Sequence, residues 1–577
     1  MFGGFKKLNM ASKLFNKLSQ LDFLARILVF WGILWGVLGL TLFFLGLMGQ
    51  YFPSIVILVF LLIILLGIYL GKKIKIGQDL KVFIKNSISF FRKDLISLTL
   101  LLAIFGFLLV NFLAALAPEL GYDALWYHLT LPKIWLSTHQ ISYISGGVLY
   151  YSVMPKLGEI FFSVGLAIEK TGTIAKLIHL SFGVFWILAA YVLCRDFLSR
   201  RISLLIAACC YGTVLVSWLS ETAYIDLIVA FYVAMGLKAI FKFYQTKDDF
   251  YLNLAAIFIG LNLASKIYGL IIFAVLAIIL FFKSGLKKFW KFIGIALVIA
   301  LPFYLEAYLA TGNPLYPVFS IRDSALDSYL AGYHTIKDWY LHVWWQGLPK
   351  LLWRVLIYDF TPIFGLVILL PLVGRWRKIL LPTLIFLVFF LFWSLIPMQE
   401  PRYFLVILPV LGLLTGFVIE NIHWQFLRIF AIILAFFVIG LNFLIIFQDY
   451  QKNFHFVFSG QSRGNYLEKN LSLSRNFYDS DSEFKKNIEP DKKVLTVEVG
   501  NMFYIDFPFW DWSFISDNYD YLTSLPNLIE RLKDEGYGYV LLGRLSPSEW
   551  TGFPEEDLTE NFELIYQKED LVLYKIK

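Results

Sequence analysis

Long apolar runs, separated by short polar stretches, fill most of the first 447 residues of the chain. A helix needs about 20 apolar residues to cross a bilayer, and most of these runs approach that length. The pattern predicts a polytopic α-helical membrane protein with about thirteen transmembrane helices. The expected spans are 25–49, 54–70, 95–117, 174–194, 202–219, 223–243, 252–264, 267–282, 290–305, 353–373, 379–396, 403–420 and 428–447.

The pattern changes after residue 447, where polar and apolar residues mix. Alternating β-branched residues predict strands, and a proline that opens an amphipathic stretch predicts a short helix. The expected elements are strands at Lys492–Val499 and Tyr539–Leu542, a helix at Pro526–Glu535, and a hairpin of Phe562–Tyr566 with Leu571–Ile576. We therefore expect a membrane domain over 1–447 and a small α/β domain over 448–577.

The charged residues predict the orientation of the spans. Lysine and arginine gather in short loops that stay in the cytoplasm. With thirteen spans, the basic loops at 72–93, 195–201, 283–291 and 375–378 fall on the same side as the basic N-terminus. We therefore expect a cytoplasmic N-terminus, an extracytoplasmic C-terminal domain and a location in the inner or plasma membrane.

Composition supports a membrane protein and excludes some partners. The 577 residues are 59% hydrophobic and 16% charged, whereas soluble domains are nearer 45–50% and 25%. The net charge of +8 does not form a basic stripe with interleaved aromatic residues, so nucleic acid is not an expected partner. The outer loops are expected at about 118–173 and 306–352.

The runs 252–264 and 267–282 are too short for two full crossings. Only about thirty residues lie between their outer ends, whereas two crossings need about forty. We expect two short helices that turn near Asn262–Lys266. Such broken helices are tolerated in a membrane where they line a cavity, and Lys266 would point into that cavity near the outer leaflet.

Asp123 is the leading candidate for chemistry. It lies in Gly121-Tyr122-Asp123-Ala124-Leu125-Trp126-Tyr127-His128, directly after the third apolar run. A carboxylate at this depth is costly unless it is used. It could act in catalysis or metal binding, or it could cap a helix. Tyr127 would share its helical face, and His128 follows as a further candidate.

Other ionisable residues are expected near the same membrane face: Glu221, Asp226, Lys266 and Arg402, which Tyr403 follows. A carboxylate that takes a proton and a pair of cations that hold a phosphate would form a transfer site. Structural roles are open for each. Asp226 could pair with a basic residue of a neighbouring span, and Lys266 could snorkel to the membrane interface. Arg402 could be an interfacial anchor beside Tyr403, and His128 could be a hydrogen-bonded loop residue.

Absent motifs narrow the chemistry. The chain has no Walker A loop, no dinucleotide fingerprint and no zinc-protease helix. The polar segments and the candidate acids face outward, where nucleotide sugars and ATP are generally lacking. A transferase there needs a donor that is already across the membrane. A polyprenyl-phosphate sugar meets this need, because its tail dissolves in the bilayer and its phosphate lies at the interface.

The order of these residues resembles the GT-C superfamily of membrane glycosyltransferases. It is most similar to the family-39-like branch of protein O-mannosyltransferases and aminoarabinose transferases. The matching pieces are Asp123 with Tyr127 and His128, Tyr224-Ile225-Asp226-Leu227, Gly260-Leu261-Asn262-Leu263-Ala264-Ser265-Lys266, and Pro401-Arg402-Tyr403 with Pro409. Two spans precede the first span that is usual in the family.

The resemblance implies an inverting transfer with Asp123 as general base. Lys266 and Arg402 would bind the leaving phosphate, and the acceptor would be a hydroxyl of a lipid, a glycan or a protein. Many members carry a second acid directly after the first, but here Ala124 occupies that place. Glu221 or Glu119 could substitute, and a divalent metal stays open.

Two other functions remain compatible with the pattern. A transporter or flippase for lipid-linked sugars would also use cavity acids and short helices. A glycan polymerase or ligase would use a polyprenyl-diphosphate donor instead of a monophosphate. We favour the transferase because the chain shows no internal repeat and has a separate polar domain at its C-terminus.

Overall fold

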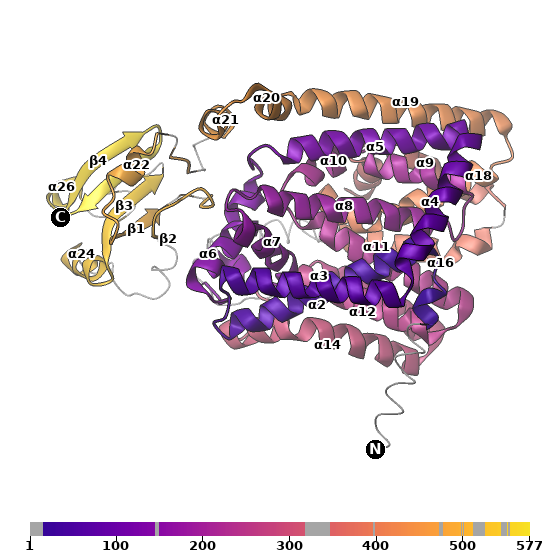
Figure 1. The fold of residues 1–577 in the computed structure, drawn as a ribbon, viewed down its shortest axis with the longest axis horizontal. Helices are drawn as coiled ribbons and strands as arrows, with labels where there is room; N and C mark the ends of the chain where they lie inside the picture. Colours follow the sequence, from indigo (N-terminus) through magenta and orange to yellow (C-terminus); the bar gives the residue numbers. More distant parts are fainter. Residues whose placement is uncertain are drawn as a thin grey trace, which may run out of the picture.

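The computed structural model describes most of the chain (Figure 1). The described residues are 16–144, 149–317, 347–374, 376–395, 399–471, 477–479, 481–497, 499, 501–511, 525–543, 548, 551 and 554–577. Most of the expected outer loop at about 306–352 therefore lies outside the described residues.

The first part of the chain is a bundle of long apolar helices. The helices that are long and apolar enough to span a membrane include α2 Phe23–Leu47, α3 Pro53–Lys73, α5 Leu95–Ala115, α8 Thr173–Cys194, α11 Asp226–Thr246, α14 Leu286–Thr311 and α19 Gln425–Asp449. α16 Leu380–Ser394 and α18 Leu408–Asn421 reach this length together with the short helices before them, as Arg377–Ser394 and Pro401–Asn421. Within the described part, nine helices are long and apolar enough to cross, or up to eleven if each of two bent pairs is one span. The prediction of a polytopic helical membrane protein is confirmed, while the number of spans stays a prediction.

The bent pairs explain why two expected spans are not single helices. The first joins α9 Arg200–Tyr211 to α10 Val214–Glu221 at 64°, and the second joins Gly347–Tyr358 to η4 Pro362–Leu372 at 113°. Thr213 begins the new helix of the first pair, because its hydroxyl accepts a hydrogen bond from the Val216 N–H. The apolar pattern alone does not carry this information.

The two short helices expected in the middle of the chain are present. α12 covers Asp249–Ser265 and α13 covers Gly269–Ser284. The chain is extended at Lys266, which ends α12. The prediction of a broken pair that turns at this lysine is confirmed.

Burial distinguishes the helices at the centre of the bundle from those at its rim. In α11, 89% of the apolar window is buried inside the protein, compared with 11% in α3. α2 packs closely because it presents Gly32, Gly36 and Gly39 to its neighbours. A Cβ atom at any of these positions would approach the side chain of Phe258, Leu261 or Leu157 to below 3 Å.

The expected outer loop at 118–173 folds into short helices. They are η1 Ala124–His128, α6 Thr130–Thr138, η2 Tyr150–Val153 and α7 Leu157–Ile168. α7 packs on α8 and is almost wholly buried. α7 therefore forms part of the protein core.

The C-terminal part contains a five-stranded sheet with the order β2-β1-β3-β5-β4. Its strands are β1 Lys493–Val497, β2 Phe509–Asp511, β3 Tyr537–Gly543, β4 Phe562–Lys568 and β5 Leu571–Ile576. β1 runs parallel to β2 and β3, whereas β5 is antiparallel to β3 and β4. With α24 Leu525–Asp534, these elements confirm the expected strands, helix and hairpin.

The sheet lies beyond the end of the bundle at which α5 finishes and α6 begins (Figure 1). Lys133 of α6 donates hydrogen bonds from Nζ to the carbonyls of Phe503, at 2.7 Å, and Ile505. The Tyr504 hydroxyl donates to the carbonyl of Glu119 at 2.7 Å. These contacts fasten the C-terminal part to the loop that carries Asp123.

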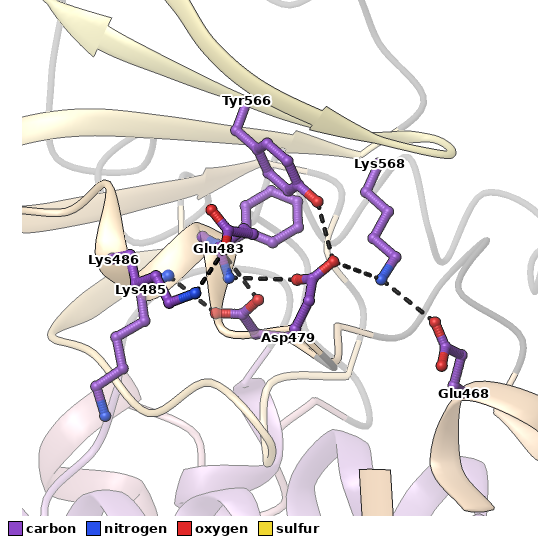
Figure 2. Close-up of polar contacts among 9 residues, drawn as sticks. Glu468, Asp479, Glu483, Lys485, Lys486, Tyr566 and Lys568 are labelled. Atoms are coloured by element: carbon purple, nitrogen blue, oxygen red, sulfur yellow. Dashed lines mark hydrogen bonds and ion pairs between the residues drawn. The ribbon is translucent and has the colours of Figure 1, made fainter. Parts of the chain in front are cut away.

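A polar network also ties the sheet to the helices that lead into it. α20 Gln451–Ser459 and α21 Arg463–Asn470 follow α19. Figure 2 shows Lys568 of β4 reaching toward Glu468 of α21, at 3.4 Å. The same ammonium contacts Asp481 at 2.9 Å, and the Tyr566 hydroxyl donates to that carboxylate at 3.1 Å. The pairs are exposed, so they orient the sheet more than they stabilise it.

Candidate functional site

Asp123 lies between α5 and η1 with its carboxylate in a set of specific contacts. Arg402 donates from Nη1 to Oδ2 at 2.6 Å, and the Tyr127 hydroxyl donates to the same oxygen at 3.2 Å. The carboxylate makes no capping hydrogen bond to η1. Its place after α5 is therefore explained by its pairing with Arg402 and not by a capping role.

A second carboxylate holds the backbone around Asp123. Glu119 is buried, and its side chain accepts hydrogen bonds from the N–H groups of Gly121, at 2.6 Å, and Ala223, at 2.7 Å. The Asp123 N–H donates to the Tyr224 hydroxyl at 3.1 Å. Two loops about 100 residues apart in sequence are thus locked together.

His179 fixes the start of α11 in a similar way. Its Nδ1 lies 2.8 Å from the Thr222 carbonyl, and the Leu227 N–H donates to its Nε2 at 3.1 Å. A carbonyl must accept and an N–H must donate, so this ring is neutral and carries its proton on Nδ1. The imidazole positions Asp226, the first residue of α11.

Asp226 pairs with the lysine at the break between α12 and α13. The Lys266 Nζ lies 3.1 Å from Oδ1 of Asp226, and the carboxylate is almost fully buried. The pairing that the sequence left open for Asp226 is therefore present. It brings Lys266 toward the Asp123 loop, because α11 begins at Asp226, two residues after Tyr224, whose hydroxyl accepts from the Asp123 N–H.

The two cations converge on one aromatic ring. Arg402 lies in α17 Pro401–Phe404, and its guanidinium is 5.3 Å from the Tyr403 ring centre, which lies 5.2 Å from the Lys266 ammonium. Arg402 also covers the ring of Tyr224 at 5.3 Å. Cations over ring faces gain an electrostatic attraction that persists when water is excluded.

A small cavity lies beside these cations. Its lining includes Asp226, Lys266, Tyr268, Arg402 and Tyr403, and its volume is about 20 Å³. This is room for about one water molecule. Lys266 and Arg402 are each paired with a carboxylate. An anion larger than this cavity would have to displace those carboxylates to contact the two cations.

His128 lies next to this cluster and forms a pair of its own. Its Nδ1 is 2.7 Å from Oε1 of Glu159, and its ring contacts that of Tyr127 with centroids 4.1 Å apart. Burial lowers the pKa of His128 well below its usual value, aided by Lys266 and Arg402. Burial raises the pKa of Glu159 to about 8. The open alternative of a hydrogen-bonded loop histidine agrees with these contacts.

Glu221 stands apart from the cluster. It ends α10, and its carboxylate accepts a hydrogen bond from the Asn453 side chain of α20 at 3.0 Å. Its role as a second acid stays a prediction without a contact to Asp123 in its support. Among the described residues, no group of three or more histidine, cysteine, aspartate or glutamate side chains is arranged to hold a metal ion.

No protein-family model matches the sequence, and no curated protein does. Solved structures nevertheless share its fold. ArnT from Cupriavidus metallidurans in the apo state superimposes with a TM-score of 0.54 at 13% identity, covering 82% of this chain and 97% of that one. ArnT bound to undecaprenyl phosphate gives 0.52 at 12% identity, with the same coverage. An oligosaccharyltransferase from Archaeoglobus fulgidus gives 0.44 at 12% identity, covering 78% and 69%.

The chain has a GT-C-like fold. The ArnT superpositions span almost the whole of that structure, so the likeness includes the membrane helices and is not limited to a local motif. At this level of identity the likeness establishes the fold alone. It confirms the resemblance that the order of motifs indicated.

Several residues of this candidate site were not predicted. Tyr224 lies under Arg402, Tyr268 stacks on Tyr403 at 4.2 Å, and Tyr151 stacks on Tyr127 at 3.8 Å. Glu159, the partner of His128, also gave no signal in the sequence. Tyr224 could have been found, because it begins the motif that contains Asp226.

Proposed function

We propose that this protein is a membrane glycosyltransferase that uses a polyprenyl-phosphate-linked sugar. The observation that carries the proposal is the convergence of Lys266 and Arg402 on one cavity, with the carboxylate of Asp123 bonded to one of them. Two cations suit a phosphate, and an adjacent carboxylate suits a proton. The fold shared with ArnT, including the structure bound to undecaprenyl phosphate, supports a lipid phosphate as the carrier.

Asp123 is the general base in this proposal. Both hydrogen bonds that described residues make to its carboxylate go to Oδ2. We assign Oδ1 to the proton of the acceptor hydroxyl. As that proton leaves, the acceptor oxygen bonds to the anomeric carbon and the bond from this carbon to the phosphate oxygen breaks. One direct displacement inverts the configuration at the anomeric carbon.

Lys266 and Arg402 receive the negative charge that develops on the leaving phosphate. Before the donor binds, each cation is held by an aspartate. Arrival of a phosphate would exchange these contacts, which would release Asp123 from Arg402 and prepare it to accept a proton. Fixed cations of this kind typically contribute a few kcal/mol to the stabilisation of a transition state.

The orientation of the reaction follows the predicted topology. The N-terminus would be cytoplasmic, and the site and the C-terminal sheet would face the other side. The acceptor is a hydroxyl of a lipid, a glycan or a protein. The contacts of Lys133 with Phe503 and of Tyr504 with Glu119 support an acceptor path bordered by residues 501–505.

The deciding experiment measures sugar transfer by purified protein in proteoliposomes. A labelled polyprenyl-phosphate sugar is supplied with a panel of lipid, glycan and peptide acceptors, and wild type is compared with Asp123→Asn. We expect transfer by wild type and almost none by the variant. Full transfer by Asp123→Asn would remove this residue as the base. Lipid scrambling without transfer would indicate a flippase, and transfer only from a diphosphate donor would indicate a polymerase or ligase.

A further inference from the structure

An amphipathic helix joins two membrane-spanning helices at the end of the bundle opposite the site. This helix, α4, covers Ile76–Lys93 between α3 and α5. In Figure 1 it runs across the long helices and not along them. Because α3 and α5 are both long and apolar enough to cross a membrane, the segment that joins them must lie at a membrane boundary.

One side of α4 is fastened to the protein. Arg26 of α2 pairs with Asp79 at 2.6 Å and donates to the Ile74 carbonyl at 3.0 Å. Phe83 packs against Phe23, with ring centroids 4.9 Å apart. These contacts fix the rotation of α4 about its own axis, and with it the direction of its outer faces.

An apolar strip on α4 is about half exposed in the described structure. Leu80, Ile84 and Ile88 follow at intervals of four residues and are 41%, 47% and 48% exposed. No residue of α4 is fully buried. Side chains at this spacing lie on one face of a helix. The exposure of these apolar side chains at a membrane boundary is explained if they enter the bilayer.

Cations border the strip along one side. Lys81, Lys85 and Arg92 lie on one further face of α4, and Ile84 and Ile88 share a shallow groove with them. The single acid of α4 is Asp79, which Arg26 neutralises on the inner face. The outer surface of the helix is therefore positive.

The positive surface continues beyond α4. A neighbouring basin is lined by Lys93, Arg200, Arg201 and Arg428, with Asp94 and Glu420 as its acids. Asp94 is engaged by Arg201 at 2.6 Å, and Glu420 accepts from the Ser199 N–H at 2.9 Å. The remaining cations of the basin give the whole boundary a net positive charge.

We propose that α4 is an interfacial helix that binds anionic phospholipid headgroups through Lys81, Lys85 and Arg92. Its strip of Leu80, Ile84 and Ile88 enters the bilayer beneath them. An amphipathic helix with a basic border fits an anionic lipid surface better than a zwitterionic one. This inference concerns the helix that follows the two extra spans, and it does not depend on the transfer reaction.

Lipid retention by the purified full-length chain tests the proposal. Protein is extracted from mixed phosphatidylglycerol and phosphatidylcholine bilayers, and bound lipid is counted by native mass spectrometry. We expect preference for phosphatidylglycerol in wild type and its loss in Lys81→Gln/Lys85→Gln/Arg92→Gln, at roughly fivefold per cation removed. Lys485→Gln/Lys486→Gln/Lys533→Gln removes equal charge from the exposed C-terminal part and should keep the preference.

Equal preference in both triple variants would overturn the proposal, and so would competition by inorganic phosphate at millimolar concentration. A second measurement covers a triple variant that fails to fold. The three native cysteines are buried, so Ile84→Cys and Ser89→Cys can be labelled selectively with a fluorophore. We expect brominated lipid to quench the label at 84 and not at 89. Equal exposure of both labels to water, or burial of 84 by a co-purifying protein, would overturn it.

Discussion

The two ends of the helix bundle carry the same kinds of ion pair in different surroundings. At one end Arg402 binds Asp123 at 2.6 Å and Lys266 binds Asp226 at 3.1 Å. At the other end Arg201 binds Asp94 at 2.6 Å and Lys238 binds Asp196 at 3.0 Å. α5 separates the two arginine pairs, and α11 carries one member of each lysine pair.

The difference lies in what else the charges touch. Asp94 also caps α5 through Ser97, and Lys238 also donates to the Val192 carbonyl at 2.9 Å. These charged groups also bond to backbone groups of the helices, and so they hold the helices in place. The pairs at the site instead rest on tyrosine rings. In the proposed reaction these pairs exchange their partners for a phosphate.

The largest expected effect separates Asp123 from Asp94. We expect Asp123→Asn to lower transfer by about 10²–10⁴-fold, because the variant removes the base and keeps the shape. Asp94→Asn keeps a capping oxygen, so it should leave transfer per folded molecule near wild type and lower stability by at most about 1 kcal/mol through loss of the negative charge at the start of α5. Activity normalised to the folded fraction, with a melting curve for each variant, checks both. Equal activity losses would contradict the comparison.

The next largest difference in activity is expected between substitutions of Arg402 and Arg201. Arg402→Lys keeps the charge and loses the planar fork, so we expect transfer to fall by about 10²-fold. Arg201→Lys is a matched change at a side chain that is 60% exposed, where an ion pair contributes about 0–1 kcal/mol. Its kcat and melting temperature should stay close to wild type. Comparable losses at both positions would show that the surroundings of the pair do not matter.

Substitution of the two lysines should affect different properties, ligand binding for Lys266 and the free energy of unfolding for Lys238. Lys266→Met should weaken binding of a polyprenyl phosphate by about tenfold or more, because one charge-assisted contact is lost. Lys238→Met should lower the free energy of unfolding by up to about 3 kcal/mol, limited by Lys242, which still neutralises Asp196. Lipid binding by microscale thermophoresis and denaturation in one detergent distinguish the two. A binding defect in Lys238→Met alone would reverse the assignment.

The smallest effect is a pH dependence at the site end. Burial raises the pKa of Glu159 to about 8, so the native carboxyl keeps a proton that the unfolded chain loses at its ordinary pKa. The contribution of Glu159 to the free energy of unfolding is complete below pH 4.5, the usual pKa of a glutamate. It is lost as the pH rises through about 8. His128, whose pKa is lowered, is neutral in both states above its usual value of 6.5.

Between pH 6.5 and 9 the melting temperature should therefore fall by a few degrees in wild type. Glu159→Gln keeps a neutral side chain at all pH values and should flatten this slope, whereas Glu420→Gln at the opposite end should not. A slope unchanged by Glu159→Gln would place the titrating group elsewhere.

The apolar pattern predicted the helices well, and it also predicted the break at Lys266. Helix formation in a membrane follows from local apolar length, so most described residues of the expected runs are helical. The bend beside Thr213 was not predicted, because a hydroxyl cap changes little in a hydropathy pattern. α4 was read only as a basic loop, since its apolar residues are spaced along one face and do not form a run.

The site was predicted in part for a similar reason. Asp123, Asp226, Lys266 and Arg402 stood out because charges are rare in apolar surroundings. The contacts between them join segments up to 279 residues apart, so their pairing could not be read from spacing. Tyr224 and Glu159 were missed because a tyrosine among many aromatic residues, and an acid in a loop, are ordinary in this chain.

The break between α12 and α13 has a consequence for how the lysine pair can open. Lys266 stands at the carboxyl end of α12, and Asp226 stands at the amino end of α11. The aligned peptide dipoles make the first of these positions partly negative and the second partly positive. When the two side chains separate, the dipole of α12 still stabilises the Lys266 ammonium and the dipole of α11 still stabilises the Asp226 carboxylate. Opening the pair therefore leaves neither charge without a favourable electrostatic interaction.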